Sequence, residues 1–354
     1  MRIAIVTDAW SPQVNGVVRT LKAVSCELAR RGHEVTVISP EGRRSIPMPF
    51  YPEIRLALTG SRTLGREIRA LAPDALYIAT EGPLGWAARK HCRRNGIPFT
   101  TGFHTRFADY LALRFPLPSL AAASWSMLRR FHAASEAVLV PTRTIAKDLE
   151  ARGFGQVTVW TRGVDHALFR PNERDVLDLP RPVSLYAGRL APEKNIEAFL
   201  GLDLPGTKLV IGDGPQRAGL ERRFPEAVFL GFRFDEELAR MMAAADVFVF
   251  PSLTDTFGLV MLEAMACGTP VAAFDVPSPI DVVTDGVTGA LDKHLKLAIL
   301  RALTLDRGKV HQGSLRFTWE RTAQIFEESL TPIGSSSSAS ADGVTTSLAP
   351  SRSG

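Results

Sequence analysis

The stretch of sequence that most constrains the fold runs from residue 246 to residue 274. It begins with a short apolar run at 246–251 and ends with another at 271–274. Between them, a polar turn at 252–257 leads into apolar positions with helical spacing, and Gly268 ends that helix. A buried strand, a helix and a second buried strand in this order predict part of a parallel α/β sheet.

Two carboxylates flank the start of the predicted helix. Asp255 lies just before it and Glu263 lies inside it, with seven residues between them. The backbone N–H groups at the start of a helix have no partner within it and readily bind phosphate. Here they belong to Thr256, Phe257, Gly258 and Leu259. A plainer interpretation makes Asp255 the N-cap and Glu263 a solvated residue. The apolar neighbours of Glu263 argue against it, because a buried acid needs a partner.

Length and composition narrow the class of protein. A chain of 354 residues is long enough for two domains, and 45% hydrophobic with 22% charged residues is typical of globular proteins. No apolar run is long enough to cross a bilayer, and we expect no signal peptide, because Met1 leads at once into an apolar strand. The cysteines lack the spacing of a metal site, which favours a reducing, cytoplasmic location; they are Cys26, Cys92 and Cys267.

The charge is distributed unevenly along the chain. Residues 1–165 contain 23 Lys and Arg against 13 Asp and Glu, a net charge of +10, whereas residues 166–354 contain 19 against 24, a net charge of −5. Paired basic residues such as Arg93-Arg94 recur in the first half. Three interpretations are open: solvated helix faces, a nucleic-acid surface, or an anionic-membrane surface. No nucleic-acid-binding module accompanies the charge, so we favour the membrane surface.

Strand-length apolar runs alternate with helical patterns in both halves of the chain. In the first half we expect strands at 2–7, 34–39, 75–79, 99–103 and 137–140, the last closing the series. In the second half we expect them at 183–187, 208–211, 227–230, 247–250 and 271–274. The alternation predicts an α/β protein with two Rossmann-like, doubly wound parallel-sheet domains. Ligands of such folds bind beyond the carboxyl ends of the strands, so a cleft between the domains is expected.

The expected domain boundaries follow from this alternation. The N-terminal domain covers residues 1–165. The C-terminal domain covers 166–314, and a connector rich in proline and charge, at 165–181, leads to its first strand. An amphipathic helix at 315–332 is expected to cross back to the N-terminal domain. The Ser-, Ala-, Gly- and Thr-rich tail at 333–354 has no apolar period, which predicts disorder.

Short polar motifs follow several of the predicted strands. The first loop lacks the G-x-G-x-x-G pattern, which argues against a dinucleotide-dependent oxidoreductase, but Asn15-Gly16 allows close approach to a ligand or forms a plain turn. Arg189 and Lys194 follow the strand at 183–187, where they suit a diphosphate or form a surface pair.

Two weaker signals lie at the same predicted edge. Gly212 and Gly214 follow the strand at 208–211 and suggest close backbone approach to a planar or phosphate group. His104 follows the strand at 99–103; a lone histidine is usually structural, but this position faces the expected cleft.

Three motifs in this order resemble those of the family-4 retaining glycosyltransferases of GT-B fold. They are Gly188-Arg189…Glu193-Lys194-Asn195, then Gly212-Asp213-Gly214-Pro215, then Asp255-x7-Glu263. The resemblance covers about residues 1–330, and the family's usual pair is Glu-x7-Glu. The subgroup with Thr-Asp-Thr-Phe-Gly includes glycolipid glycosyltransferases, sulfoquinovosyltransferases and GDP-mannose-dependent mannosyltransferases. The segments 8–17, 80–85 and 104–107 look most like those of alphaproteobacterial diacylglycerol glycosyltransferases.

The resemblance implies roles for individual residues. Arg189 and Lys194 would bind the donor diphosphate, and Glu263 would bind the ribose hydroxyls. Asp255 would contact the transferred sugar, and its side chain is one methylene shorter than the usual Glu. The remaining candidates are His104 near the reacting carbon, Asn15 and Gly16 on the acceptor side, and Gly212, Gly214, Thr256, Phe257, Gly258 and Leu259 around the donor. No cofactor and no metal is implied, because cations and helix N-termini can neutralise the diphosphate.

From these observations we expect an enzyme that moves a hexose from a nucleotide sugar, UDP-glucose, UDP-galactose or UDP-glucuronate, to a lipid acceptor such as diacylglycerol. It would be cytoplasmic and peripheral on the inner face of the membrane, held there by the basic N-terminal domain. One alternative is a GDP-mannose-dependent mannosyltransferase acting on a lipid or polysaccharide. Another is a non-catalytic protein that binds nucleotide sugars, against which the retained polar set argues.

Overall fold

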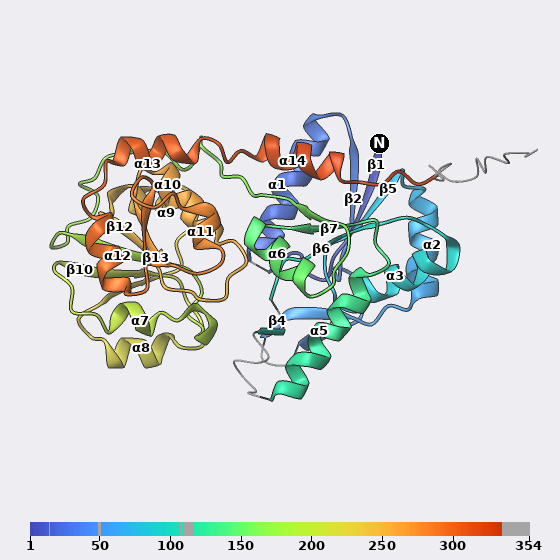
Figure 1. The fold of residues 1–354 in the computed structure, drawn as a ribbon, viewed down its shortest axis with the longest axis horizontal. Coiled ribbons are helices and arrows are strands. Elements are labelled where there is room, and N and C mark those ends of the chain that lie inside the picture. The colour runs from blue at the N-terminus through green and yellow to red at the C-terminus, as the bar shows by residue number, and fades with distance from the viewer. Residues whose placement is uncertain (14, 49–50, 107, 110–116, 335–354) are drawn as a thin grey trace, which may run out of the picture.

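The structure, a computed structural model, describes residues 1–13, 15–48, 51–106, 108–109 and 117–334. Two α/β units lie side by side in it, and the chain passes from one to the other near residue 165 (Figure 1). The tail predicted to be disordered lies outside the described residues from residue 335 onward.

The first sheet has six parallel strands in the order β2-β1-β5-β6-β7-β8. They are β1 (Arg2–Val6), β2 (Glu34–Ile38), β5 (Ala75–Ile78), β6 (Thr100–Gly102), β7 (Ala137–Val140) and β8 (Val157–Val159). Its helices are α1 (Gly16–Arg30), α2 (Ser61–Leu71), α3 (Pro83–Asn95), α5 (Pro118–His132) and α6 (Arg143–Ala151). Every strand of this sheet lies within residues 1–165.

The second sheet also has six parallel strands, in the order β11-β10-β9-β12-β13-β14. They are β9 (Val183–Ala187), β10 (Thr207–Ile211), β11 (Val228–Gly231), β12 (Val247–Phe250), β13 (Val271–Phe274) and β14 (Gly289–Asp292). Its helices are α7 (Glu197–Leu200), α8 (Arg217–Arg223), α9 (Asp235–Ala244), α10 (Leu259–Ala266), α11 (Pro279–Val282), α12 (Leu295–Ala302) and α13 (Arg307–Ser314). The doubly wound, two-domain architecture predicted from the sequence is confirmed.

Alternation of side chains along each strand explains why helices cover both faces. In β1, Ile3 and Ile5 pack into one apolar cluster with α1, whereas Ala4 and Val6 pack into another with α2 and α3. Because successive side chains of a strand point to opposite faces, an apolar run without polar alternation needs cover on both sides.

The strand predictions missed three features. Strands β3 (Ser45–Met48) and β4 (Tyr51–Ala57) form an antiparallel hairpin outside both main sheets. The first sheet does not close at 137–140, because β8 pairs with β7. Strand β14 extends the second sheet beyond β13. Edge strands such as β8 and β14 are short and only partly buried, so their apolar pattern is weak.

The last helix, α14 (Trp319–Glu328), lies on the N-terminal unit beside α1 (Figure 1). Its Phe326 and Ala323 belong to the same apolar cluster as Ile3 and Ile5. The indole N–H of Trp160 donates a hydrogen bond of 2.9 Å to the carbonyl of Thr322. The helix therefore follows the C-terminal domain in sequence but completes the core of the N-terminal domain.

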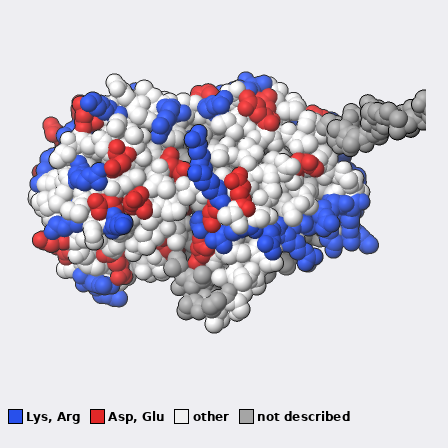
Figure 2. All heavy atoms as spheres, viewed as in Figure 1, with Lys and Arg blue, Asp and Glu red and all other residues white. Residues whose placement is uncertain are grey.

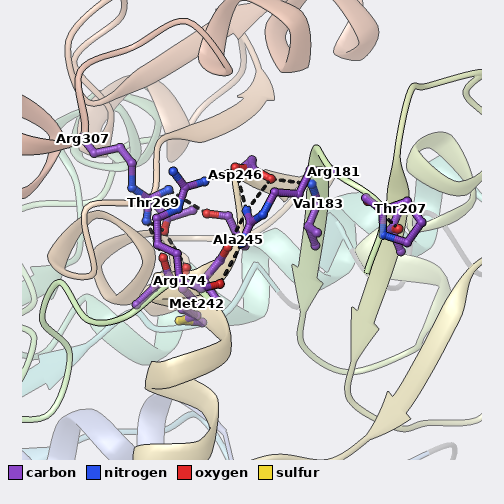
Figure 3. A network of polar contacts seen from close by, with 12 residues as sticks. Arg174, Arg181, Val183, Thr207, Met242, Ala245, Asp246, Thr269 and Arg307 are labelled. Carbon is purple, nitrogen blue, oxygen red and sulfur yellow. Dashed lines mark hydrogen bonds and ion pairs between the residues drawn. The ribbon is translucent and has the colours of Figure 1, made fainter. Parts of the chain in front are cut away.

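A polar network holds the connector to the amino edge of the second sheet (Figure 3). Asp246, just before β12, accepts a 2.7 Å hydrogen bond from the backbone N–H of Val183 and pairs with Arg174 and Arg181. Arg307 donates to the carbonyls at the end of α9. Burial lowers the pKa of the Arg307 guanidinium to about 10. The network thus connects the chain before β9 to α13 and β12.

Replacing Asp246 should destabilise the C-terminal domain. In Asp246→Ala, Arg174 and Arg181 lose their shared carboxylate and the Val183 N–H loses its acceptor, at an expected cost of about 2 kcal/mol in the free energy of unfolding. Urea denaturation measures it. Asp203→Ala is the control, because the Asp203 side chain is fully exposed and should change stability by under about 0.5 kcal/mol. Equal stability of the two variants would contradict the role given to the network.

Candidate active site

Three loops meet at the carboxyl edge of the second sheet. They follow β9, β10 and β12, and hydrogen bonds join them. The N–H of Leu190 donates to the carbonyl of Asp213 at 2.9 Å, and the side-chain amide of Asn195 donates to the carbonyl of Pro251 at 3.1 Å. The motifs that the sequence analysis took from three separate segments are therefore neighbours in space.

Gly212 and Gly214 allow two of these loops to pack backbone against backbone. Both have positive φ, +136° and +156°. A Cβ on Gly212 would lie 1.8 Å from the carbonyl oxygen of Gly188, and one on Gly214 would lie 2.5 Å from that of Leu190. The close approach predicted for these glycines is thus between two loops of the chain itself.

Lys194 and Asp255 form an ion pair in this structure. Lys194 ends a single 3₁₀ turn at Pro192–Lys194, and its Nζ lies 2.5 Å from Oδ1 of Asp255. Arg189 lies on the same loop, partly buried, and its backbone carbonyl accepts a 2.8 Å hydrogen bond from the Tyr186 hydroxyl. The loop after β9 therefore carries two cations, and one of them, Lys194, pairs with Asp255 from the loop after β12.

No side chain among the described residues caps the start of helix α10. Its N-cap is Gly258, in the left-handed conformation with φ of 76°, so the interpretation of Asp255 as the N-cap is wrong. A Cβ on Gly258 would also lie 2.7 Å from Cζ of Phe250. Both the positive φ and the lack of space for a side chain therefore favour glycine here. The hydroxyl of Thr254 in the preceding turn is buried and has no hydrogen-bond partner among the described residues. The N-terminus of α10 thus remains open to an acceptor group.

Glu263 is buried and has its cationic partner in the other domain. Only 2% of the residue is exposed. Its Oε1 pairs with the guanidinium of Arg19 on α1, whereas its Oε2 is buried and has no hydrogen-bond partner in the part of the chain that the structure describes. The expectation that this buried acid needs a partner is confirmed, and the partner is supplied by the facing domain.

His104 is held inside the N-terminal domain. Its Nε2 lies 2.9 Å from the hydroxyl of Tyr77, and its Nδ1 lies 3.1 Å from a guanidinium nitrogen of Arg162. Burial, reinforced by the positive charge of Arg162, holds the pKa of His104 well below its usual range, so the ring is neutral. Burial also lowers the pKa of Arg162 to about 10. Because Arg162 can only donate, Nδ1 accepts and Nε2–H faces Tyr77.

His104 meets the C-terminal domain through its backbone. Its carbonyl oxygen accepts a 2.7 Å hydrogen bond from the hydroxyl of Thr256. Both ring nitrogens that would contact a sugar are occupied in this arrangement, so the residue lines the domain junction by its main chain.

Helix α1 begins opposite α10. The side chain of Asn15 caps α1 by accepting 3.0 Å hydrogen bonds from the N–H groups of Val17 and Val18. A Cβ on Gly16 would lie 3.7 Å from Cδ1 of Leu259, the first residue of α10. The N-termini of two helices, one from each domain, therefore approach one another, and both carry partial positive charge.

Asp8 anchors the loop that leads to α1. Its carboxylate accepts from the Thr80 hydroxyl at 2.9 Å and from the N–H of Leu84 at 3.0 Å, in the first turn of α3. Burial raises the pKa of this carboxyl despite those hydrogen bonds. The contacts join the segments 8–17 and 80–85, which the sequence analysis grouped only by resemblance.

Three further residues of the site, Arg19, Arg162 and Tyr77, belong to no motif recognised in the sequence. Arg19 offered a signal: it lies one turn into a helix, where a cation opposes the helix dipole and needs a compensating acid. Arg162 and Tyr77 lie within apolar surroundings that look like ordinary core, and only the fold brings them to His104.

The described part of the chain holds no group of three or more His, Cys, Asp or Glu side chains arranged to bind a metal ion. Within the same residues, no helix is both long and apolar enough to cross a membrane. The described residues of the junction include the cations Arg19, Arg189 and Lys194, the carboxylates Asp255 and Glu263, and the N-termini of α1 and α10. Such a set suits an anionic ligand that also carries hydroxyl groups.

Comparison with protein families gives two matches. Residues 14–168 match the model described as Glycosyltransferase Family 4, and residues 181–303 match that described as Glycosyl transferases group 1. Each match covers most of one domain.

Similar proteins act on sugars. The chain is 34% identical, over 82% of its length and 83% of the relative's, to a GDP-mannose-dependent alpha-mannosyltransferase of Mycobacterium tuberculosis. It is 34% identical to the sulfoquinovosyl transferase SQD2 of Arabidopsis thaliana, over 71% of this chain and 52% of that protein. It is 27% identical to the alpha-monoglucosyldiacylglycerol synthase of Streptococcus pneumoniae, over 86% of this chain and 78% of that protein.

Among solved structures, a sucrose-phosphate synthase from Thermosynechococcus elongatus has the same fold. It superposes with a TM-score of 0.73 at 21% identity, over 92% of this chain and 97% of that chain.

Replacing Gly212 should destabilise the C-terminal domain by separating two loops of the candidate site. Gly212→Ala forces the loops after β9 and β10 apart, because the new Cβ would clash with the carbonyl of Gly188. We expect a loss of about 2 kcal/mol or more in the free energy of unfolding, measured by thermal or urea denaturation. Gly219→Ala is the matched control: it lies in α8 with open space around its Cβ, and alanine should stabilise that helix by about 0.5–1 kcal/mol. A neutral Gly212→Ala would contradict the close packing of the loops.

Proposed function

This chain belongs to the family-4 retaining glycosyltransferases of GT-B fold and transfers a sugar from a nucleotide sugar; from this premise we propose that it glycosylates a lipid acceptor, diacylglycerol or a close analogue, at a membrane surface. The donor is a UDP-hexose in the first candidate reaction and GDP-mannose in the second. The 34% identity to a GDP-mannose-dependent enzyme favours the second. The similarity to a monoglucosyldiacylglycerol synthase favours the lipid acceptor.

The residues at the domain junction support a division of labour. Arg189 and Lys194 neutralise the donor diphosphate, together with the N–H groups at the start of α10. In the structure Lys194 is paired with Asp255. The diphosphate therefore either shares Lys194 with that carboxylate or replaces the carboxylate as its partner. Asp255 then turns to the hydroxyls of the transferred sugar, and Oε2 of Glu263 accepts from the ribose.

Charge stabilisation is the main task of this site. When the bond between sugar and diphosphate breaks, negative charge develops on the leaving phosphate oxygens. Fixed cations and helix N-termini stabilise that charge more in the transition state than in the ground state. We propose that these groups suffice without a metal ion, and a rate unchanged by EDTA is the expected result.

One observation carries the membrane-surface proposal. The outer faces of the adjacent helices α2 and α3 hold exposed cations, which are Arg62, Arg66, Arg69, Lys90, Arg93 and Arg94. Helix α3 contains no acid, and the single acid of α2, Glu67, pairs with Arg43. Lys and Arg gather over this part of the N-terminal domain (Figure 2). A cationic face of this kind attracts anionic lipid headgroups by about 1 kcal/mol per residue.

The activity can be tested with a panel of donors. Purified chain is mixed with diacylglycerol and UDP-glucose, UDP-galactose, UDP-glucuronate or GDP-mannose, and products are identified by mass spectrometry. A hexosyl-diacylglycerol is expected. Arg189→Ala and Lys194→Ala should each lower kcat/KM by at least about a hundredfold, because each removes a charge that stabilises the leaving group.

The control for these variants is Arg222→Ala, an exposed arginine on α8 away from the loops of the site. It should keep wild-type activity. Transfer to soluble or polysaccharide acceptors only would contradict the lipid acceptor, and near-normal turnover in the Arg189 and Lys194 variants would contradict their role at the diphosphate.

Membrane binding can be tested by vesicle flotation. The wild-type chain should float with phosphatidylcholine vesicles that contain phosphatidylglycerol, and less at high salt, because salt screens the attraction. Reversing two charges in Arg93→Glu/Arg94→Glu should weaken binding at least about tenfold. Arg222→Glu/Arg223→Glu makes the same change in an exposed pair at the end of α8 and should bind normally. Equal loss in both double variants would attribute the effect to net charge instead of this face.

A further inference from the structure

The ion pair between Arg19 and Glu263 joins the two domains at the candidate donor site. Arg19 lies one turn into α1, and Glu263 lies in the middle of α10. The Arg19 side chain is 43% exposed, whereas that of Glu263 is 3% exposed. The two domains therefore meet here through a buried carboxylate and a cation that still reaches solvent.

Both partners stand in positions that cost free energy when unpaired. The start of α1 carries the positive end of the helix dipole and no acid in its first turn, so a cation there is unfavourable without a nearby anion. Glu263 is surrounded by the buried apolar residues of α10, where a lone carboxylate is strongly disfavoured. The pair relieves both costs at once.

The carboxylate of Glu263 is only half satisfied. Arg19 holds Oε1, and Oε2 is buried with no hydrogen-bond partner among the described residues. Buried polar atoms in native proteins nearly always have a partner, so an unmet acceptor at a ligand site indicates a donor group that arrives with the ligand. The Thr254 hydroxyl in the same segment is also buried and unpartnered.

Two contacts beside the Arg19–Glu263 pair also join the two domains. The Thr256 hydroxyl donates to the carbonyl of His104, and Leu259 lies against Gly16. These contacts fix the position of α1, and so of Arg19, relative to α10. Arg19 can therefore hold Oε1 of Glu263 in one orientation and leave Oε2 available to a ligand.

We propose that Arg19 is a positioning residue for the donor: from the facing domain it holds Oε1 of Glu263, so that Oε2 is presented to the ribose hydroxyls of the nucleotide. This role rests on the proposed function of Glu263 in nucleotide-sugar binding. It also means that full donor affinity requires contact between the two domains, because Glu263 comes from one domain and Arg19, which orients it, comes from the other.

The test compares Arg19→Ala, Arg19→Lys and Arg30→Ala in the full chain. Arg30 lies at the end of the same helix and pairs with Glu27 of its own domain, so it is a matched control. UDP and GDP serve as probes in isothermal titration calorimetry, and the nucleotide sugar that turns over serves in kinetics. Arg19→Ala should weaken nucleotide binding and raise KM for the donor about tenfold, with kcat within about twofold.

Two further variants separate positioning from folding. Arg19→Lys keeps a cation of similar reach and should restore most of the affinity, whereas Arg30→Ala should bind like wild type. In the presence of Glu263→Gln, removing Arg19 should cost nothing more, because the two residues act as one unit. Thermal unfolding of each variant checks that the fold is retained.

Several outcomes would overturn the role of Arg19. An unchanged KM in Arg19→Ala would show that the pair only joins the domains. A lower KM would show that Arg19 competes with the donor for Glu263. Additive losses for Arg19 and Glu263 would show independent roles. Failure of the wild-type chain to bind either nucleotide would overturn the proposed donor site and this role with it, and so is distinguished from the other outcomes.

Discussion

Burial of both faces of two parallel sheets is the constraint from which the rest of the structure follows. Parallel strands need a crossover after each strand, and apolar strands such as β1 and β12 need helices on both sides. Each crossover brings a loop and the N-terminus of a helix to the carboxyl edge. The loops after β9, β10 and β12 therefore meet, and α10 presents its N-terminus there.

Two ion pairs join charged groups at that edge. Lys194 pairs with Asp255 within one domain, and Glu263 pairs with Arg19 across the two. Such pairing keeps the site folded without leaving isolated charges in apolar surroundings. A donor that binds here would replace some of these ion pairs with its own contacts. Its affinity would then depend on the difference in free energy between the new contacts and the ion pairs that they replace.

Most of the fold was predictable because both sheets have a strong local pattern. The central strands were found near their observed bounds, since apolar runs of four or five residues between helices leave few alternatives. The misses, β3, β4, β8 and β14, are a hairpin and edge strands, where burial is partial and periodicity weak. The alternative that makes Asp255 the N-cap of α10 is wrong, and the role of Gly258 in a left-handed turn is not evident from residue type alone.

The family and the two-domain architecture are recognisable in the sequence, because they depend on the order of strands, helices and short motifs along the chain. Which charges meet at the domain junction follows from the tertiary structure alone. Glu263 and Arg19 lie far apart in sequence but form an ion pair. The two ring nitrogens of His104 form hydrogen bonds with Tyr77 and Arg162. Such contacts depend on how two domains dock and on where each side chain points, and neither is encoded in local periodicity.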